Sequence, residues 1–467
     1  MRLQAGMKAL VLGLGVSGRS VVRFLRSQGL EVAVSEHRPM DRLTAGELEL
    51  VETMDVRLET GGHSGRYLAD ADVVVAGPGV PLDLDILARA RQRRIPVLGE
   101  LALAAGRFPA PVIAVTGSNG KTTVTGLIGE LLETAGFRVF VGGNIGTPLL
   151  DFFAGPGRAD FVVLELSSFQ LELAGDFRAD IGLLLNITPD HLDRHGSMER
   201  YAAAKYRIFA GQQEDDVAIL GADDALVMAA DTGRAARRTF GRAHGCDAVV
   251  SGSRVLVPGQ GETLSFDLAG SRLDSAVNRL NAAAAILAAQ AAGCGVAAIQ
   301  QGLRRYRPPE HRMSLVGSRD GVRWINDSKA TNVGAMAAAL ASCDSPVVLI
   351  AGGRDKGGDF SVLRPLVRDR VRALVLIGEA AGIIADQLGD LAPVIRASDM
   401  AGAVRSAAAA ARAGDTVLLA PGCASFDMFD SYEQRGRVFT RLAREMLAAG
   451  AVPGSAAAGE AGCEEGP

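Results

Sequence analysis

The chain has 467 residues, of which 48% are hydrophobic and 22% are charged, and its formal net charge is −4. At roughly 150 residues per domain, this length predicts about three domains, and the apolar content is sufficient for each to have its own core. The composition therefore excludes a predominantly disordered protein, and the weak negative charge excludes a general nucleic-acid-binding surface.

The five cysteines are far apart in the sequence and form no CxxC pair. An odd number at such spacing argues against a disulfide framework and against a zinc-thiolate site. No apolar run reaches the ~18 residues that a membrane helix requires. We therefore expect a cytoplasmic protein that binds neither a membrane nor nucleic acid.

The first two domains are predicted at residues 1–107 and 108–309. Short β-rich runs at 9–12, 32–35 and 73–76 alternate with helical patterns, which is typical of parallel βαβ units. A stretch rich in proline and glycine near residue 108 then precedes a new strand, and this change marks the domain boundary.

The third domain is predicted at residues 310–451. Pro308 and Pro309 prevent the continuation of a helix expected over residues 280–292. Later strands at 347–351, 373–377 and 416–420 alternate with alanine-rich helices and predict another open parallel sheet. Residues 452–467 are expected to be a disordered tail. The predicted fold class is α/β, with a Rossmann-like domain on each side of a P-loop-type ATPase domain.

The first glycine-rich loop is GLGVSG at residues 13–18. It follows a strand and opens a helix, so its glycines allow a tight turn that brings a helix N-terminus to a phosphate. Glu36 ends the next strand, where an acidic residue can hold a ribose. The pattern alone is compatible with a dinucleotide dehydrogenase, with binding of a different nucleotide, or with packing glycines.

The second glycine-rich loop, GSNGKTT at residues 117–123, is more specific. It joins a buried strand to a helix and brings backbone amides, Lys121 and the Thr122 hydroxyl together. These groups bind phosphates and magnesium. The loop is shorter than the general P-loop pattern.

Polar residues follow two further apolar strands of the second domain. Glu165 ends the strand at 161–164 and is a candidate magnesium ligand, although a glutamate at a strand end is commonly only solvated. His191 follows the next strand, in a segment that also contains Asp190 and Asp193, and it could serve magnesium or a transferring phosphoryl group. The residues alone predict that Lys205 is an ordinary lysine on a helix surface.

Only five residues of this arginine-rich chain are lysine, at positions 8, 121, 205, 329 and 356. Lysine is a compact ammonium or a nucleophilic amine that a guanidinium does not imitate, although chance retention explains any single one equally well. Lys329 and Lys356 lie in the loops NDSKATN and AGGRDKGGDF, which follow strands of the third domain. A third such loop, at 420–436, contributes Ser425.

Taken in order, several motifs resemble those of the Mur ligase family over about residues 8–447: GSNGKTT, ELSSFQLE, DHLDRHG with YAAAKYR, NDSKATN, GGRDKGGDF and ASFDMFDSYEQRG. NDSKATN resembles the D-glutamate-adding branch, because the other branches have a histidine-containing sequence there. The resemblance implies that ATP phosphorylates the carboxylate of UDP-N-acetylmuramoyl-L-alanine and that D-glutamate then attacks the acyl phosphate. It also implies two magnesium ions, and we expect a monomer.

The resemblance further assigns residues to ligands. The UDP-containing substrate would contact Leu14, Gly15, Val16, Ser17, Gly18, Glu36, Arg38, Gly79, Asn144 and Gln170. ATP would contact Gly117, Ser118, Asn119, Gly120, Lys121, Thr122, Thr123, Asn278, Asn281, Arg312 and Asp327. D-Glutamate would contact Thr331, Lys356, Ser425 and Tyr432. Magnesium would be held by Thr122, Glu165, His191 and a carbamylated Lys205, and the catalytic residues would be Lys121, His191, Lys205 and Lys329.

Three alternatives stay open. A nicotinamide-dependent dehydrogenase would leave GSNGKTT and the third-domain lysines without a role, whereas a nucleotide switch would explain the P-loop without amide synthesis. A sister Mur ligase or a folylpolyglutamate-type ligase is disfavoured by the third-domain motifs. If an acyl phosphate is formed, it must be shielded from water, so we expect the third domain to move about a hinge at residues 308–312.

Overall fold

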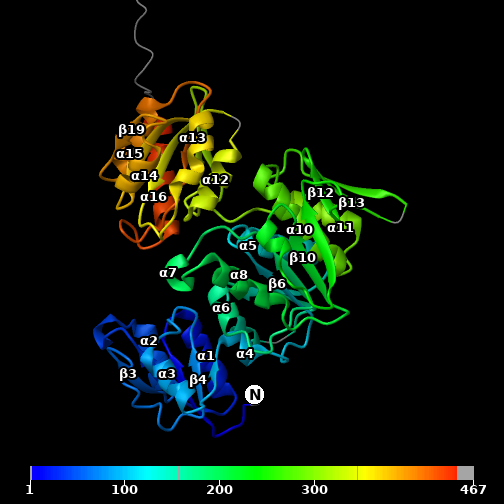
Figure 1. Ribbon diagram of the computed structural model, residues 1–467, viewed down its shortest axis with the longest axis vertical. Coiled ribbons are helices and arrows are strands. Elements are labelled where there is room, and N and C mark those ends of the chain that lie inside the picture. The colour runs from blue at the N-terminus through cyan, green and yellow to red at the C-terminus, as the bar shows by residue number, and fades with distance from the viewer. Residues whose placement is uncertain (1–2, 156–157, 260, 344, 450–467) are drawn as a thin grey trace, which may run out of the picture. The chain divides into compact units, whose positions relative to one another are not determined.

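The computed structural model describes residues 3–155, 158–259, 261–343 and 345–449, so the expected disordered tail lies outside the described residues. The chain divides into two compact units. The N-terminal unit contains residues 1–188 and 194–308, and the C-terminal unit contains residues 189–193 and 309–467. Three β-sheets with flanking helices make up these units, two in the first and one in the second (Figure 1).

The first sheet has five parallel strands in the order β3-β2-β1-β4-β5. This order extends the 3-2-1-4 start of a Rossmann-type sheet, as expected. Its strands are β1 (Lys8–Leu12), β2 (Glu31–Glu36), β3 (Arg57–Thr60), β4 (Val73–Ala76) and β5 (Val97–Leu98). Its helices are α1 (Val16–Ser27), η1 (Met40–Arg42), α2 (Ala45–Thr53), α3 (Asp85–Gln92) and α4 (Glu100–Ala104).

The second sheet has nine strands in the order β14-β13-β12-β11-β10-β9-β6-β8-β7. The strands from β12 to β7 are parallel, whereas β12, β13 and β14 form an antiparallel meander that the sequence analysis did not anticipate. The strands are β6 (Val112–Thr116), β7 (Val139–Gly143), β8 (Phe161–Glu165), β9 (Ile181–Leu184), β10 (Val217–Gly221), β11 (Ala236–Gly241), β12 (Ala248–Ser251), β13 (Arg254–Pro258) and β14 (Thr263–Asp267). The helices are α5 (Lys121–Thr134), η2 (Leu149–Phe153), α6 (Ser168–Glu172), α7 (Leu192–His195), α8 (Met198–Tyr206), η3 (Arg207–Phe209), α9 (Ala225–Met228), α10 (Ala276–Ala291) and α11 (Val296–Arg305).

The third sheet has six strands in the order β15-β16-β20-β17-β18-β19. The expectation of an open parallel sheet is correct except at its edge, because β15 pairs antiparallel with β16. The strands are β15 (Ser314–Arg319), β16 (Val322–Asn326), β17 (Val347–Gly352), β18 (Val371–Ile377), β19 (Val394–Arg396) and β20 (Thr416–Leu419). The helices are α12 (Val333–Ala341), η4 (Phe360–Leu363), α13 (Arg364–Arg370), α14 (Ala381–Leu388), α15 (Met400–Ala410) and α16 (Tyr432–Ala449).

The central strands are continuous apolar runs because helices cover both faces of these parallel sheets. In β17, all six residues of VVLIAG are buried. On β16, Trp324 is 3% exposed and its ring lies 6.1 Å from that of Phe439 on α16. The C-terminal unit therefore has its own apolar core.

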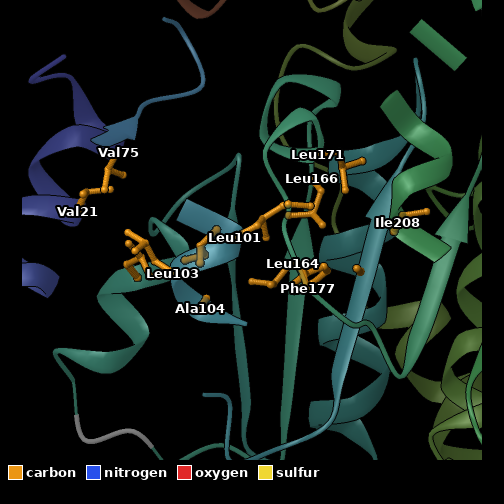
Figure 2. Close-up of a cluster of buried hydrophobic side chains, with 14 of the residues drawn as sticks. Val21, Val75, Leu101, Leu103, Ala104, Leu164, Leu166, Leu171, Phe177 and Ile208 are labelled. Carbon is orange, nitrogen blue, oxygen red and sulfur yellow. The ribbon is translucent and has the colours of Figure 1, made fainter. Parts of the chain in front are cut away.

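In the N-terminal unit, one hydrophobic cluster includes side chains of both sheets and of α4. Figure 2 shows Leu101, Leu103 and Ala104 of α4 in this cluster, which also contains Val21 of α1 and Leu164 of β8. The short helix α4 thus connects the packing of the first sheet to that of the second. Within the described ranges, no helix is long and apolar enough to cross a membrane.

Candidate functional site

The loop at 117–120 connects β6 to α5 in a backbone conformation that depends on glycine. Gly117 has φ 152° and Gly120 has φ 86°. A Cβ at position 120 would also lie only 2.5 Å from Oδ1 of Asn281, which is on α10. The close approach of Asn281 and the positive φ both require glycine here. The loop leads directly into the first turn of α5, whose N–H groups and helix dipole favour an anion such as a phosphate.

Ser118 and Asn119 fix the loop to the segment that follows β9. The Ser118 N–H donates to Asn186 O at 2.9 Å, and the Asn119 N–H donates to Asn186 Oδ1 at 2.8 Å. The Ser118 hydroxyl donates to Thr188 O at 2.9 Å and lies 3.0 Å from the hydroxyl of Tyr201. These two expected ATP residues therefore hold the shape of the loop through their contacts with the protein.

Two lysines donate to the same backbone carbonyl of the loop. Lys121 Nζ and Lys205 Nζ each lie 2.8 Å from Gly117 O, and Lys121 also donates to Ser118 O at 2.8 Å. Lys205 is 1% exposed and its Nζ lies 4.5 Å from the ring centroid of Tyr201. The expectation of a surface lysine, drawn from the residues alone, is wrong: α8 packs with this lysine turned inward to the P-loop.

Glu165, at the end of β8, is a buried carboxylate with one oxygen available to a ligand. It is 2% exposed, and its Oε1 accepts a hydrogen bond from Asn144 Nδ2 at 2.9 Å. Its Oε2 is buried without a hydrogen-bond partner. A buried carboxylate oxygen is costly unless a partner or a metal ion satisfies it. The donor chemistry of Glu165 and of the Thr122 hydroxyl, which lies in the first turn of α5, fits magnesium. The described residues contain no preformed cluster of three or more His, Cys, Asp or Glu side chains.

The loop after β1 is held by the acidic residue that the sequence analysis assigned to a ribose. Glu36 Oε2 accepts the Leu14 N–H at 2.7 Å, and Oε1 accepts the Arg38 N–H at 2.9 Å. Arg38 also bridges Glu36 and Glu47, with a 3.0 Å contact to Glu47 Oε1. Burial alone would raise the pKa of Glu36, but the hydrogen bonds from Arg38 and Leu14 lower it to about 2. The carboxylate is thus ionised and directed at the protein.

The other expected substrate contacts of the first domain lie in the loop after β1, in the first turn of α1 and in the turn after β4. A Cβ at Gly18 would clash with Gly13 O, which explains the glycine. Gly15 is the N-cap of α1, and Val16, Ser17 and Gly18 form its first turn. Gly79 lies in the turn after β4.

Two further groups of expected ligand residues belong to the N-terminal unit. Asn278 and Asn281 lie one turn apart on α10, and Asn281 Nδ2 donates to Asn278 Oδ1 at 3.1 Å. Gln170 is in α6, immediately after the strand that ends at Glu165. Thr123 is buried in α5, and its carbonyl accepts the hydroxyl proton of Tyr306 at 3.0 Å.

In the C-terminal unit, Asp327 follows β16 in a buried position. Burial raises its pKa to about 7, while the Met313 N–H, at 3.2 Å from Oδ1, and the charge of Arg312 lower it in part. Two residues further on, Lys329 Nζ lies 4.1 Å from the ring centroid of Tyr432. In the structure, Arg312 therefore acts electrostatically on Asp327, and the Lys329 ammonium lies over the Tyr432 ring.

A small hollow in the same unit is lined by Thr331, Asn332 and Lys356, and by Asp190 from the 189–193 segment. Lys356 Nζ lies 3.3 Å from Asp190 Oδ1, and Asn332 Nδ2 donates to Asp190 Oδ2 at 3.0 Å. Ser425 is not among the lining residues. Of the expected D-glutamate contacts, the hollow brings together Thr331 and Lys356.

Asp190 and Asn332 are residues that our assignment of site residues missed. His191, with φ 55°, belongs to the same 189–193 segment, and its Nε2 lies 3.6 Å from Asp190 Oδ2. His191 is therefore grouped with the C-terminal unit. The other expected metal ligands, Thr122, Glu165 and Lys205, belong to the N-terminal unit. The acidic pair flanking His191 was visible in the sequence, but its grouping with the Lys356 loop was not.

Arg435 on α16 is the second feature that the sequence analysis missed. It is 1% exposed and donates to Ser328 O at 2.8 Å, to Cys423 O at 3.1 Å and to Ala424 O at 3.3 Å. Burial lowers its pKa to about 10, which leaves it charged at neutral pH. This guanidinium connects the NDSKATN loop to the loop that contains Ser425.

Comparison with known proteins identifies the family of the chain. Three family profiles match in order: "Mur ligase MurD-like, N-terminal domain" at residues 7–99, "Mur ligase middle domain" at 115–289 and "Mur ligase, glutamate ligase domain" at 311–423.

Individual relatives agree with the profiles. The chain is 46% identical over 432 residues to a UDP-N-acetylmuramoylalanine--D-glutamate ligase of Desulfotalea psychrophila, covering 92% of this chain and 94% of the relative. It is 44% identical to the protein of that name from Acidobacterium capsulatum, covering 94% and 96%. The solved structure of the MurF ligase from Thermotoga maritima in complex with ADP shares the fold, with a TM-score of 0.60 at 18% identity, and covers 90% of this chain and 96% of that one. The chain belongs to the Mur ligase family, in its MurD-like branch.

Proposed function

We propose that the protein is an ATP-dependent ligase that joins D-glutamate to UDP-N-acetylmuramoyl-L-alanine in the synthesis of a peptidoglycan precursor. The observation that carries this proposal is the similarity, over more than nine-tenths of the chain, to ligases of that name. The P-loop supports it, because an acyl-phosphate mechanism needs a site for the phosphates of ATP. The comparisons leave the dehydrogenase and nucleotide-switch alternatives without support.

Two bonds are made in turn. An oxygen of the L-alanyl carboxylate attacks the γ-phosphorus of ATP, and ADP leaves. The amine nitrogen of D-glutamate then attacks the acyl carbon, phosphate leaves, and the nitrogen loses a proton as the amide forms. Phosphoryl transfer depends mainly on positioning and charge neutralisation. In this proposal Lys121 and Lys329 neutralise phosphate charge, and Lys356 binds a carboxylate of D-glutamate.

The N-terminal unit supplies magnesium ligands through Glu165 Oε2 and the Thr122 hydroxyl. We propose that Lys205 is carbamylated: its neutral amine adds to carbon dioxide, an N–C bond forms and a proton is released. The product is a carboxylate next to the P-loop, where Lys205 Nζ already contacts Gly117 O. Bound magnesium polarises the phosphoryl oxygens and neutralises the charge that develops on them. His191 is proposed as a further ligand.

The remaining assignments also stay proposals. We propose that Asn278, Asn281, Arg312 and Asp327 contact ATP, that the loop at 14–18 with Arg38 and Gly79 holds the UDP group, and that Asn144 and Gln170 contact the muramoyl group. Glu36 contributes by holding Arg38 and the Leu14 N–H. The protein is proposed to act as a cytoplasmic monomer whose third domain moves about residues 308–312.

The test is phosphate release by the purified protein with ATP and magnesium. UDP-N-acetylmuramoyl-L-alanine is added together with a panel of D- and L-amino acids. The proposal requires release that depends on both the nucleotide substrate and D-glutamate. Release with a different amino acid would retain the mechanism and reject the D-glutamate assignment, and release without the nucleotide substrate would reject the ligase.

A further inference from the structure

Glu100 is a buried carboxyl for which the proposed chemistry has no use. It is the first residue of α4 and is 3% exposed. Its Oε1 accepts a hydrogen bond from Gln170 Nε2 at 2.5 Å, whereas its Oε2 is buried without a hydrogen-bond partner. Burial raises the pKa of Glu100 to about 7. Burying a carboxyl is unfavourable, so the group calls for an explanation.

Its partner, Gln170, has both ends of its amide held. Gln170 Oε1 accepts from the Ser167 N–H at 2.8 Å and from the Ser167 hydroxyl at 3.0 Å, in a capping box that begins α6. This fixes the orientation of the amide and directs Nε2 to Glu100. An apolar residue at position 100 would leave a Nε2 donor of Gln170 without its acceptor.

Ser17, in the first turn of α1, lowers the pKa of Glu100 and so acts against the effect of burial. The hydrogen bond that the structure gives the Glu100 carboxyl comes from Gln170 Nε2.

The surroundings of Glu100 are closely packed. The next residues of α4 belong to the shared hydrophobic cluster, in which Leu101 and Leu103 are labelled in Figure 2. The preceding residue, Gly99, is so close to α6 that a Cβ there would lie 2.8 Å from Leu173 Cβ. The carboxyl therefore lies where α4 and α6 pack together within the N-terminal unit.

Asp151 of η2 is the charged group that acts on Glu100, and it raises the pKa of Glu100 further. Asp151 is itself paired with Arg23 of α1 at 2.9 Å and accepts a hydrogen bond from Ser20 at 2.7 Å. A neutral carboxyl at position 100 keeps its acceptor for Gln170 without placing a second negative charge there.

We propose that Glu100 is a positioning residue for the nucleotide-sugar substrate. It fixes the side-chain amide of Gln170, so the residue proposed to contact the muramoyl group keeps one orientation. This inference rests on the proposed function, because Gln170 is a substrate contact only in that function.

The test compares variants at Glu100 and Gln170 by calorimetric binding of UDP-N-acetylmuramoyl-L-alanine and by steady-state kinetics. Glu100→Met keeps the length of the side chain and removes the acceptor, so the Kd for this substrate should rise about tenfold, as loss of a buried hydrogen bond predicts. Glu100→Gln retains an acceptor for Gln170 and should stay within about twofold of the unchanged protein. The KM values for ATP and D-glutamate should stay within about twofold in both variants. In a Gln170→Met background, Glu100→Met should have no further effect on the Kd, because the two residues act as one unit.

Asp216→Asn is the matched control. Asp216 is also a buried carboxylate, 1% exposed and paired with Arg178 at 2.7 Å, but it precedes β10 at the end of the strand opposite to the site. It should alter thermal stability and leave the Kd unchanged.

Two results would overturn the inference alone: an unchanged Kd in Glu100→Met, or equal losses for all three substrates. If Glu100→Met does not fold, Glu100→Ala takes its place, and an unchanged Kd in that variant would overturn the inference. Absence of substrate binding by the unchanged protein would instead overturn the proposed function, and this inference with it.

Discussion

Lys205 Nζ donates a hydrogen bond to Gly117 O at 2.8 Å, although 88 residues separate the two in the sequence. The contact places a buried primary amine at the carbonyl with which the phosphate loop begins. An amine in this position can become a carbamate beside the phosphates, which a guanidinium cannot do.

We predict that Lys205→Ala and Lys205→Arg each reduce phosphate release about 100-fold or more, since a proposed metal ligand is lost. Added acetate or formate should restore part of the activity of Lys205→Ala, because a small carboxylate can occupy the vacated space. Lys8→Ala, at the start of β1, is the control and should retain full activity. Full activity of Lys205→Ala without any carboxylate would rule out the carbamate.

The contact between Gly120 and Asn281 gives a second prediction. Gly120→Ala should lower the melting temperature and raise the KM for ATP, because the new Cβ is both strained and within 2.5 Å of Asn281 Oδ1. Strain alone costs on the order of 1–2 kcal/mol. Gly136→Ala is matched to it, with φ 95° but no atom within 4 Å of its Cβ. Equal effects of the two substitutions on ATP binding would show that the Asn281 contact is irrelevant.

Lys356 is predicted to select for D-glutamate. Lys356→Ala should raise the KM for D-glutamate about tenfold, as expected for a charge-assisted hydrogen bond, and the KM for ATP much less. Arg354→Ala is the control from the same loop, because Arg354 is half exposed and pairs with Glu379 at 2.9 Å. A larger change in the KM for ATP than in that for D-glutamate would reverse the assignment.

Arg435→Met should destabilise the C-terminal unit by about 3 kcal/mol, because three backbone carbonyls lose a charged donor. The KM for D-glutamate should rise at the same time, since the loops on either side of the guanidinium are no longer connected. Thermal melting and kinetics provide the two readouts. Arg441→Met removes an exposed arginine of the same helix and should be neutral in both.

The pKa of Glu100 predicts how stability depends on pH. The folded state raises this pKa from 4.5 to about 7, so the folded protein binds the proton more tightly than the unfolded chain does. The resulting stabilisation is complete below pH 4.5 and is lost as the pH rises through 7. At 1.36 kcal/mol per pH unit this amounts to roughly 3 kcal/mol. The melting temperature of Glu100→Gln minus that of the unchanged protein should therefore be larger at pH 8 than at pH 5. A constant difference between the two proteins across this range would contradict the shift.

The sequence identified elements that have strong local signals. The apolar run at 112–115 became β6, and the glycines of the following loop required positive φ. The β12–β14 meander was missed because its strands are only four or five residues long and lie far from any motif.

The burial and the contacts of individual side chains were harder to predict than the helices and strands. The pattern around Lys205 on α8 does not reveal which face is buried, because alanines occupy three of its neighbouring positions. The pairing of Asp190 with Lys356 joins residues that are 166 positions apart, and Glu100 with Gln170 joins residues 70 apart. Such contacts depend on how sheets and loops pack, and local propensity does not contain that information.

Trp324 is the only tryptophan of the chain, and it is buried against Phe439. Indole emission therefore reports on the C-terminal unit alone, whereas circular dichroism reports on helices and strands of both units. Recording the two signals during one denaturant titration would separate the unfolding of the proposed amino-acid-binding unit from that of the P-loop unit without any added label. Coincident transitions would mean that the two units unfold as one cooperative system.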